Sequence, residues 1–300
     1  YYTVDGLFLL LVLFFFHFLF HALESGRVPW YALVGAAVGM IGAVRLNGLV
    51  LGLIVLAGHC LWTDPSNCHS RWVRAVRRLL SAHVWVSGAA ALAVLVILAP
   101  YLVADSERVF VPRPAHNFAL ALQIAKGDML TLWNLVDVHT TPYWHHWTSL
   151  LPTSVGWPLA LASAAGLIFV LRRPERSSAL MLMWCGAHFL LVGGLQTKHV
   201  RYLLPLLPFF CMFAAAAGIH GWVQLRSRGG RLVARLFTVC TVAYTALFGI
   251  AFASIYSVED SRIQAGRWIA GYLPKSSRLG LEKGAFAFRR DLVRLDDFNT

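Results

Sequence analysis

The chain has 300 residues, of which 58% are hydrophobic and only 13% charged, and its mean hydropathy is +0.63. This composition excludes an ordinary soluble domain, because apolar runs of about 18–20 residues recur along the chain as they do in membrane proteins. The formal net charge of +12 lies mostly in short loops, which favours contact with anionic lipid headgroups over nucleic-acid binding.

The long apolar runs predict an all-α polytopic membrane protein with about eight transmembrane helices. Their approximate ranges are 7–24, 29–45, 48–62, 82–104, 155–172, 179–195, 202–222 and 236–256. The second and third helices are joined only by the turn Arg45-Leu46-Asn47-Gly48. Gly35, Gly39 and Gly42 precede this turn, and small residues of this kind let membrane helices pack closely.

Basic residues set the predicted orientation in the membrane. They gather in four loops that fall on one side when the crossings are counted, and the positive-inside rule makes that side cytoplasmic. These loops contain Arg27, Arg71–Arg78, Arg172–Arg176 and Arg226–Arg235. The outer side then receives residues 1–5, Arg45, the loop 105–154, Lys198–Arg201 and the tail beyond Tyr256. We therefore predict a multi-pass protein of the inner or plasma membrane whose long loop and C-terminal tail face away from the cytoplasm.

The outer loop 105–154 is predicted to contain a short helix that lies in the membrane interface. Phe118 and Leu122 have helical spacing, as do Leu132 and Leu135 after a break at Gly127-Asp128.

The tail 257–300 opens on a capping-box pattern at Ser257–Asp260. A helix, a turn at 273–277 and a strand at 278–282 are expected to follow. We therefore expect a transmembrane domain over 1–256 and, in 257–300, the start of a small extracytoplasmic α/β domain.

Lys198 and Arg201 stand out because they are cations on the predicted outer side. They are three residues apart at a predicted helix start, so both could face one site. Arg offers a fork of donors to a phosphate, and Lys offers a mobile point charge. Arg45, at the tip of the helical hairpin, is a third outer cation. An anionic ligand such as a lipid phosphate would explain all three, although snorkelling or anchoring at the interface is an open alternative.

Two further outer features have more than one reading. Asp5 begins the first helix, where it is either a helix cap or a carboxylate in an outer cleft. The segment Asp137–Trp147 combines aromatic residues, histidines and one carboxylate. It suits an interfacial aromatic belt or a sugar or headgroup site, and its histidine spacing matches no standard metal site.

The stretch Lys198-His-Val-Arg-Tyr-Leu-Leu-Pro205 resembles the K-x-x-R-Y-L-L-P signature of membrane glycosyltransferases of the GT-C type. The closest subgroup is the superfamily of protein O-mannosyltransferases and lipid A aminoarabinose transferases, which is glycosyltransferase family 39-like. Four other stretches resemble elements of that family in the same order. They are Tyr2–Asp5 before a Phe/Leu helix, the hairpin Gly35–Gly48, the outer element His139–Tyr143, and Ala265–Ser277 at the start of a soluble domain.

The resemblance implies that a sugar is transferred from a polyprenyl-phosphate donor to a lipid, glycan or protein acceptor at the outer face. It implies that Lys198, Arg201 and Arg45 bind the donor phosphate, because cations stabilise the charge that develops on a leaving phosphate. No cofactor is certain, and a divalent metal is compatible with the family. Membrane lipids are expected partners, and nucleic acid is not.

The remaining residues that match the family pattern receive supporting roles. His139, Tyr143 and Tyr202 would contact the substrate, and Asp5 would support catalysis. The family's catalytic base lies in a first outer loop that has no counterpart here, so we expect an N-terminally truncated fragment without that base.

Two other functions compete with this interpretation: a transporter or flippase of lipid-linked sugars, and a non-catalytic membrane scaffold. A transporter should have ionisable residues or broken helices near the membrane midplane. The charges of this chain cluster instead at helix ends, which favours an interfacial enzyme.

The predicted topology can be tested at Thr140, which lies in the predicted outer loop. A Thr140→Cys variant should react with a membrane-impermeant maleimide applied from the extracytoplasmic side. Labelling from the cytoplasmic side alone would reverse the orientation.

Overall fold

The computed structural model describes residues 4–62, 79–105, 107, 118–130, 134–172, 175–225, 227–274 and 277. Every regular element in these ranges is a helix, so the prediction of an all-α chain is confirmed for the described residues. The basic stretch 71–78 and the predicted strand 278–282 lie outside them. The α/β character expected of the tail therefore stays a prediction.

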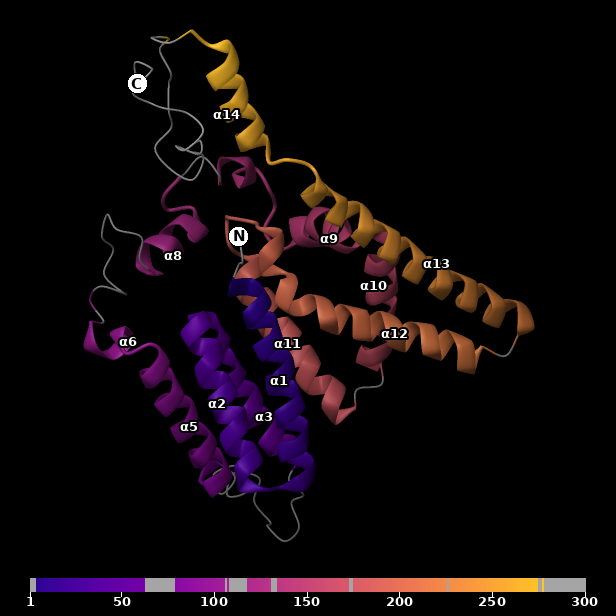
Figure 1. Ribbon diagram of the computed structural model, residues 1–300. Coiled ribbons are helices and arrows are strands. Elements are labelled where there is room, and N and C mark those ends of the chain that lie inside the picture. The colour runs from indigo at the N-terminus through magenta and orange to yellow at the C-terminus, as the bar shows by residue number, and fades with distance from the viewer. Residues whose placement is uncertain are drawn as a thin grey trace. The chain divides into compact units, whose positions relative to one another are not determined.

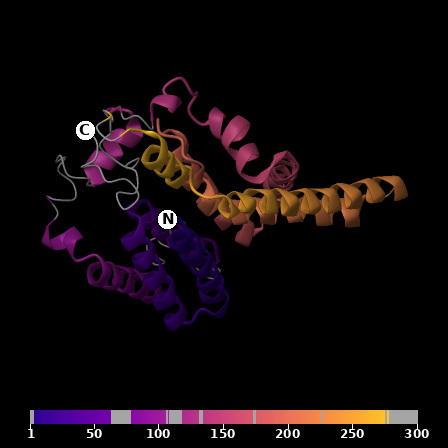
Figure 2. The same cartoon turned by 45° about the horizontal axis from the view of Figure 1, so that its top comes forward.

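The chain divides into two compact units, residues 1–242 and 243–300. In the first unit α1 (Val4–Ser25), α2 (Val28–Val44), α3 (Leu51–Trp62) and α5 (Ala82–Leu98) lie side by side (Figures 1 and 2). Gly26 has a φ of 62°, which allows the tight turn between α1 and α2. The 3₁₀ helix η1 (Leu46–Val50) makes the turn between α2 and α3.

Glycine allows α2 to approach α5 at backbone distance. A Cβ atom at Gly35 would overlap the Ser87 carbonyl, and one at Gly39 would overlap the Ala91 carbonyl. Gly42 instead faces Leu49 within the hairpin. The close packing expected from these glycines is therefore confirmed, and its main partner is α5.

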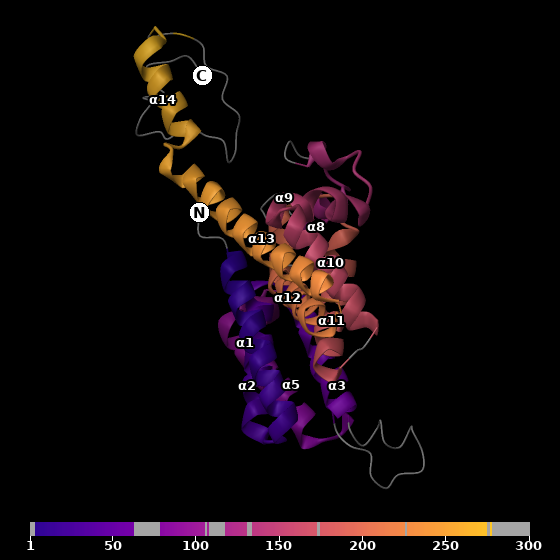
Figure 3. The same cartoon turned by 90° about the vertical axis from the view of Figure 1, so that its right-hand side faces the viewer.

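A second group of helices consists of α10 (Trp157–Arg172) and α12 (Leu207–Gln224), which pack side by side (Figure 3). α11 (Arg176–Gly193) packs against α3 of the first group. The π-helical turn η3 (His146–Leu150) and α9 (Leu151–Val155) lead into α10. Two 3₁₀ turns, η4 (Val200–Tyr202) and η5 (Leu204–Leu206), precede α12. The predicted helix start near 202 is therefore corrected to Leu207, since Pro205 and Pro208 cannot donate backbone hydrogen bonds.

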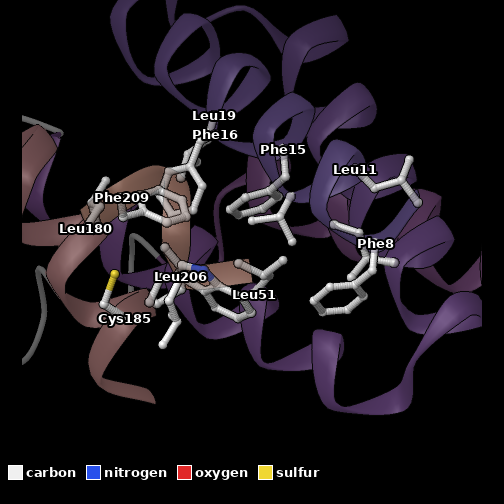
Figure 4. Close-up of a cluster of buried hydrophobic side chains, with 14 of the residues drawn as sticks. Phe8, Leu11, Phe15, Phe16, Leu19, Leu51, Leu180, Cys185, Leu206 and Phe209 are labelled. Atoms are coloured by element: carbon white, nitrogen blue, oxygen red, sulfur yellow. The ribbon is translucent and has the colours of Figure 1, made fainter. Parts of the chain in front are cut away.

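A shared core joins the two groups. One face of α1 contributes Phe8, Phe15 and Leu19, which meet Leu51 of α3 and Phe209 of α12 (Figure 4). All five side chains are buried. In a lipid environment such a core is held by close packing more than by removal of apolar surface from water.

A buried polar group ties α2, α3 and α5 together. The Tyr31 hydroxyl lies 2.9 Å from His59 Nδ1, and the Ser81 hydroxyl lies 3.0 Å from His59 Nε2. These contacts lie at the start of α2 and α5 and the end of α3.

Among the described residues, three helical segments are long and apolar enough to cross a membrane. They are Val4–Ser25, Val200–His220, which joins η4, η5 and most of α12, and Arg228–Ser257, which joins α13 and η6. Only 6% of the most apolar part of Arg228–Ser257 is buried, so its apolar side chains require lipid or another apolar surface. The shorter apolar helices are Val28–Val44, Leu46–Trp62, Ala82–Leu98 and Trp157–Arg172. A membrane protein is thus indicated, and eight spans remain a prediction.

Two predicted boundaries are corrected. α5 ends at Leu98, and a separate short helix α6 (Tyr101–Ala104) follows Pro100, because proline disfavours helical backbone in the residue before it. The last long helix, α13 (Arg228–Ala253), begins earlier than 236. Arg228, Arg231 and Arg235 therefore lie on this helix and not in a loop.

The second unit contains η6 (Ser254–Ser257) and α14 (Ser261–Tyr272). Ser257 is not the N-cap of α14 as expected, because α14 begins at Ser261 and Ser257 is the last residue of η6, where its hydroxyl donates to the Ser254 carbonyl at 2.6 Å. The Asp260 carbonyl instead accepts from Ile263 and Gln264. At the predicted turn the Ser277 amide donates to the Pro274 carbonyl at 3.1 Å, and residues 275 and 276 lie outside the described ranges.

Replacing Gly35 by valine should destabilise the protein by about 2–3 kcal/mol, since the added side chain meets fixed backbone and forces α2 away from α5. Thermal unfolding in detergent measures the effect. Gly88→Val is the matched control, because no atom lies within 4 Å of a Cβ placed at Gly88 of α5. Equal losses in the two variants would contradict glycine-mediated packing.

Candidate functional site

A cavity of about 920 Å³ lies beside the C-terminal end of α2 and the two 3₁₀ turns that precede α12. We call it the arginine cavity, after Arg45 and Arg201. Its walls come from α1, α2, η1, α6, α11, η4, η5 and α8 (Phe118–Lys126), the short helix predicted in the outer loop. The lining residues are Phe8, Gly42–Asn47, Tyr101, Leu102, Ala121, Leu122, Ala125, His188, Leu191, Val192, Leu195, Arg201, Tyr202 and Pro205.

Arg45 lies in the cavity wall and is oriented by Asp5. Its guanidinium donates to Asp5 Oδ1 in an ion pair between the hairpin tip and the start of α1. The Asp5 side chain is 5% exposed and that of Arg45 25%. The Arg45 Cζ also lies 6.0 Å from the centre of the Phe8 ring. Asp5 itself does not line the cavity, so in this structure it acts through Arg45.

Arg201 and Tyr202 enter the cavity from the 3₁₀ turn η4. Arg201 is exposed, and its Cζ lies 5.8 Å from the centre of the Tyr202 ring. Among the described residues Arg201 forms no ion pair with a carboxylate. Three of the seven predicted site residues, Arg45, Arg201 and Tyr202, are thus brought to one cavity.

The cavity also contains residues that the sequence reading missed. His188 of α11 is 2% exposed, and its Nε2 lies 3.0 Å from the Tyr202 carbonyl oxygen. Its Nδ1, like Oδ1 of Asn47, is buried and has no hydrogen-bond partner among the described residues. The sequence does contain an indication of His188, because it is a histidine inside an apolar helix, ten residues before Lys198. Ionisable residues in such helices are commonly functional.

Lys198 is placed elsewhere. It is only 4% exposed, and its ammonium group donates to the Gln196 carbonyl at 3.1 Å. Burial lowers the pKa of Lys198, and the nearby Asp137 opposes that shift. The expectation that Lys198 and Arg201 share one face is wrong, because His199 has extended backbone (φ −86°, ψ 136°) and the three-residue relation requires a helix.

The outer element around His139 and Tyr143 does not reach the cavity. His139 is exposed, whereas Tyr143 packs on a pair of glycines. The Tyr143 amide donates to the Gly193 carbonyl at 2.9 Å, and its hydroxyl lies 2.8 Å from the position of a Cβ at Gly194. Tyr143 also has a φ of 59°, which is unusual for a residue with a side chain. In this structure it docks the loop against the end of α11.

His146 is buried beside this loop at 1% exposure, and neither ring nitrogen has a partner among the described residues. Burial, followed by the positive charge of Lys198, lowers the pKa of His146 from 6.5 to about 4, although Asp137 opposes the shift. Burial also lowers the pKa of the neighbouring His199. Both histidines are therefore neutral near pH 7.

Within the described residues, no three His, Cys, Asp or Glu side chains lie close enough together to hold a metal ion. The aromatic and histidine-rich segment 137–147 thus offers no such group in the ranges that the structure covers.

No family model, curated protein or solved structure matches this chain.

The protein should lose stability as the pH falls from about 6.5 to 4. The unfolded chain takes up a proton at His146 near pH 6.5, and the folded chain does so only near pH 4, so the unfolded state binds more protons between these values. The unfolding temperature in detergent should be lower at pH 5 than at pH 7.5. His146→Phe should reduce this difference, and an unchanged pH dependence in that variant would contradict the assignment to His146.

Proposed function

We propose that this protein is a membrane glycosyltransferase of the GT-C type. It would transfer a sugar from a polyprenyl-phosphate donor to a lipid, glycan or protein acceptor. The supporting observation is that Arg45 and Arg201, far apart in the sequence, line the same cavity. The sequence pattern and the family resemblance independently assign both residues to phosphate binding.

The chemistry of the cavity suits an amphiphilic anion. Arg45 and Arg201 supply fork-like donors that match a phosphate, and Arg201 adds a positive charge that no described carboxylate pairs. Most of the remaining wall is apolar, including Phe8, Leu122 and Leu191, and such a surface accommodates a prenyl chain. Asp5 holds Arg45 in place without neutralising Arg201.

The transfer would break the bond between the anomeric carbon and the phosphate oxygen and form a bond from that carbon to the acceptor oxygen. The acceptor proton passes to a base, and the electron pair of the broken bond stays on the phosphate. Arg45 and Arg201 would stabilise the charge that grows on this leaving group. None of the described lining residues is a carboxylate, so these residues are assigned to donor binding and not to proton abstraction.

We further propose that the four shorter apolar helices and α11 also cross the membrane, which together with the three long helices gives the eight-span topology. A helix of 17 residues such as α2 is about 25 Å long, against a hydrocarbon thickness of about 30 Å. Adjoining turns such as η1 and α6 extend the shorter helices. The arginine cavity would then open at the extracytoplasmic face of the plasma or inner membrane.

The proposal is tested by comparing farnesyl phosphate with farnesol, which lacks the anion. The wild-type protein in detergent should bind the phosphate more tightly than the alcohol. Arg45→Gln and Arg201→Gln should each weaken phosphate binding by about 10- to 100-fold, because a hydrogen bond to a charged group contributes about 1.5–3 kcal/mol. Farnesol binding should be unchanged.

Arg172→Gln is the matched control, because Arg172 is an exposed cation at the end of α10 and does not line the cavity. Equal affinity of the wild-type protein for the two ligands, or equal losses in all three variants, would contradict the phosphate site. With membranes and polyprenyl-phosphate-linked mannose or aminoarabinose as donors, sugar transfer distinguishes an enzyme from a flippase, which would move the donor without releasing free polyprenyl phosphate.

A further inference from the structure

The segment that presents Arg201 is short and has little regular structure. We call residues 198–202 the arginine turn. Lys198 and His199 precede η4, whose internal hydrogen bonds run from Tyr202 to His199 at 3.0 Å and from Leu203 to Val200 at 3.0 Å. Two such hydrogen bonds do not determine how the turn is oriented relative to the cavity, so contacts with surrounding side chains must do so.

Asp137 holds the beginning of the turn. Its Oδ2 accepts a hydrogen bond from the Lys198 amide at 2.9 Å, and both residues are buried. Its carbonyl oxygen accepts from Gln196 Nε2 at 2.8 Å. A carboxylate is a strong acceptor for a backbone amide, and burial strengthens the bond further.

The loop that supplies Asp137 is itself seated at a second point. Tyr143 rests on Gly193 and Gly194, where a Cβ on either glycine would be within 3 Å of the Tyr143 ring or hydroxyl. Asp137 therefore belongs to a loop whose position is also fixed by the contact of Tyr143 with the end of α11.

His188 holds the end of the turn. Its Nε2 lies 3.0 Å from the Tyr202 carbonyl oxygen, and because a carbonyl only accepts, Nε2 must carry the proton. The ring is packed between Trp184 and Phe8, with centroid distances of 4.9 Å and 6.4 Å. This packing fixes the direction in which the imidazole donates.

We propose that Asp137 and His188 are positioning residues that fix the arginine turn from both ends, so that Arg201 faces the cavity before a ligand arrives. The inference rests on the proposed function, because it concerns the cation assigned to phosphate binding. Arg201 is next to Tyr202, the residue that His188 holds. Ordering the turn in advance spares the conformational entropy that binding would otherwise cost.

The test uses two matched pairs of variants. Asp137→Ala and His188→Leu remove the hydrogen bonds, whereas Asp137→Asn retains an acceptor and His188→Gln can retain a donor near the position of Nε2. Removal should weaken farnesyl phosphate binding by about 3- to 10-fold, the range expected for one buried hydrogen bond. Farnesol binding should not change in Asp137→Ala, because Asp137 does not line the cavity. The conservative variants should recover most of the phosphate affinity.

Hydrogen exchange at the amides of residues 198–203 provides a readout that does not depend on the ligand. Exchange should be faster in Asp137→Ala and His188→Leu than in their conservative counterparts. Unchanged exchange in both removal variants, or equal losses for farnesyl phosphate and farnesol in Asp137→Ala, would overturn the positioning role. If the wild-type protein shows no preference for the phosphate, the proposed function fails, and the exchange rates still decide whether the two residues hold the turn.

Discussion

The ion pair between Asp5 and Arg45 links the start of α1 to the tip of the α2–α3 hairpin. It lies where an apolar bundle ends, so each charge would be costly to bury without the other. The pairing lets a guanidinium remain in the wall of an otherwise apolar cavity. The glycine contacts between α2 and α5 keep the helix that leads to Arg45 in position. The packing of α2 against α5 therefore also determines where the Arg45 guanidinium lies.

The second cation depends on a different kind of support. Arg201 lies on a 3₁₀ turn held by Asp137 at one end and His188 at the other. Lys198 was expected to contact the ligand from its spacing and Tyr143 from the family resemblance. In the structure the Lys198 ammonium group donates to the Gln196 carbonyl, and Tyr143 packs against Gly193 and Gly194. A polar loop can thus contribute to an anion site without touching the anion, because it restricts the backbone that carries the charged side chain.

Most of the helical architecture was predictable, because a membrane helix is encoded locally by a run of apolar residues. Glycine spacing in α2 correctly indicated close packing, although the sequence could not identify α5 as the partner. Helix ends were less predictable near proline, as at Pro100 and Pro205. Of the site, Arg45, Arg201 and Tyr202 were predicted and His188 was not, since an isolated histidine in an apolar run gives no indication of its partner.

By itself, the sequence determined that this chain is helical and built for an apolar environment, and it predicted outer cations that bind an anionic ligand. Local properties, namely side-chain hydrophobicity and the positions of charges between apolar runs, were sufficient for this. Only the tertiary structure decided which cations share a cavity. Residues three apart lie on one face of a helix, but the backbone at His199 is extended. Lys198 is therefore buried in a loop contact, whereas Arg201 lines the cavity.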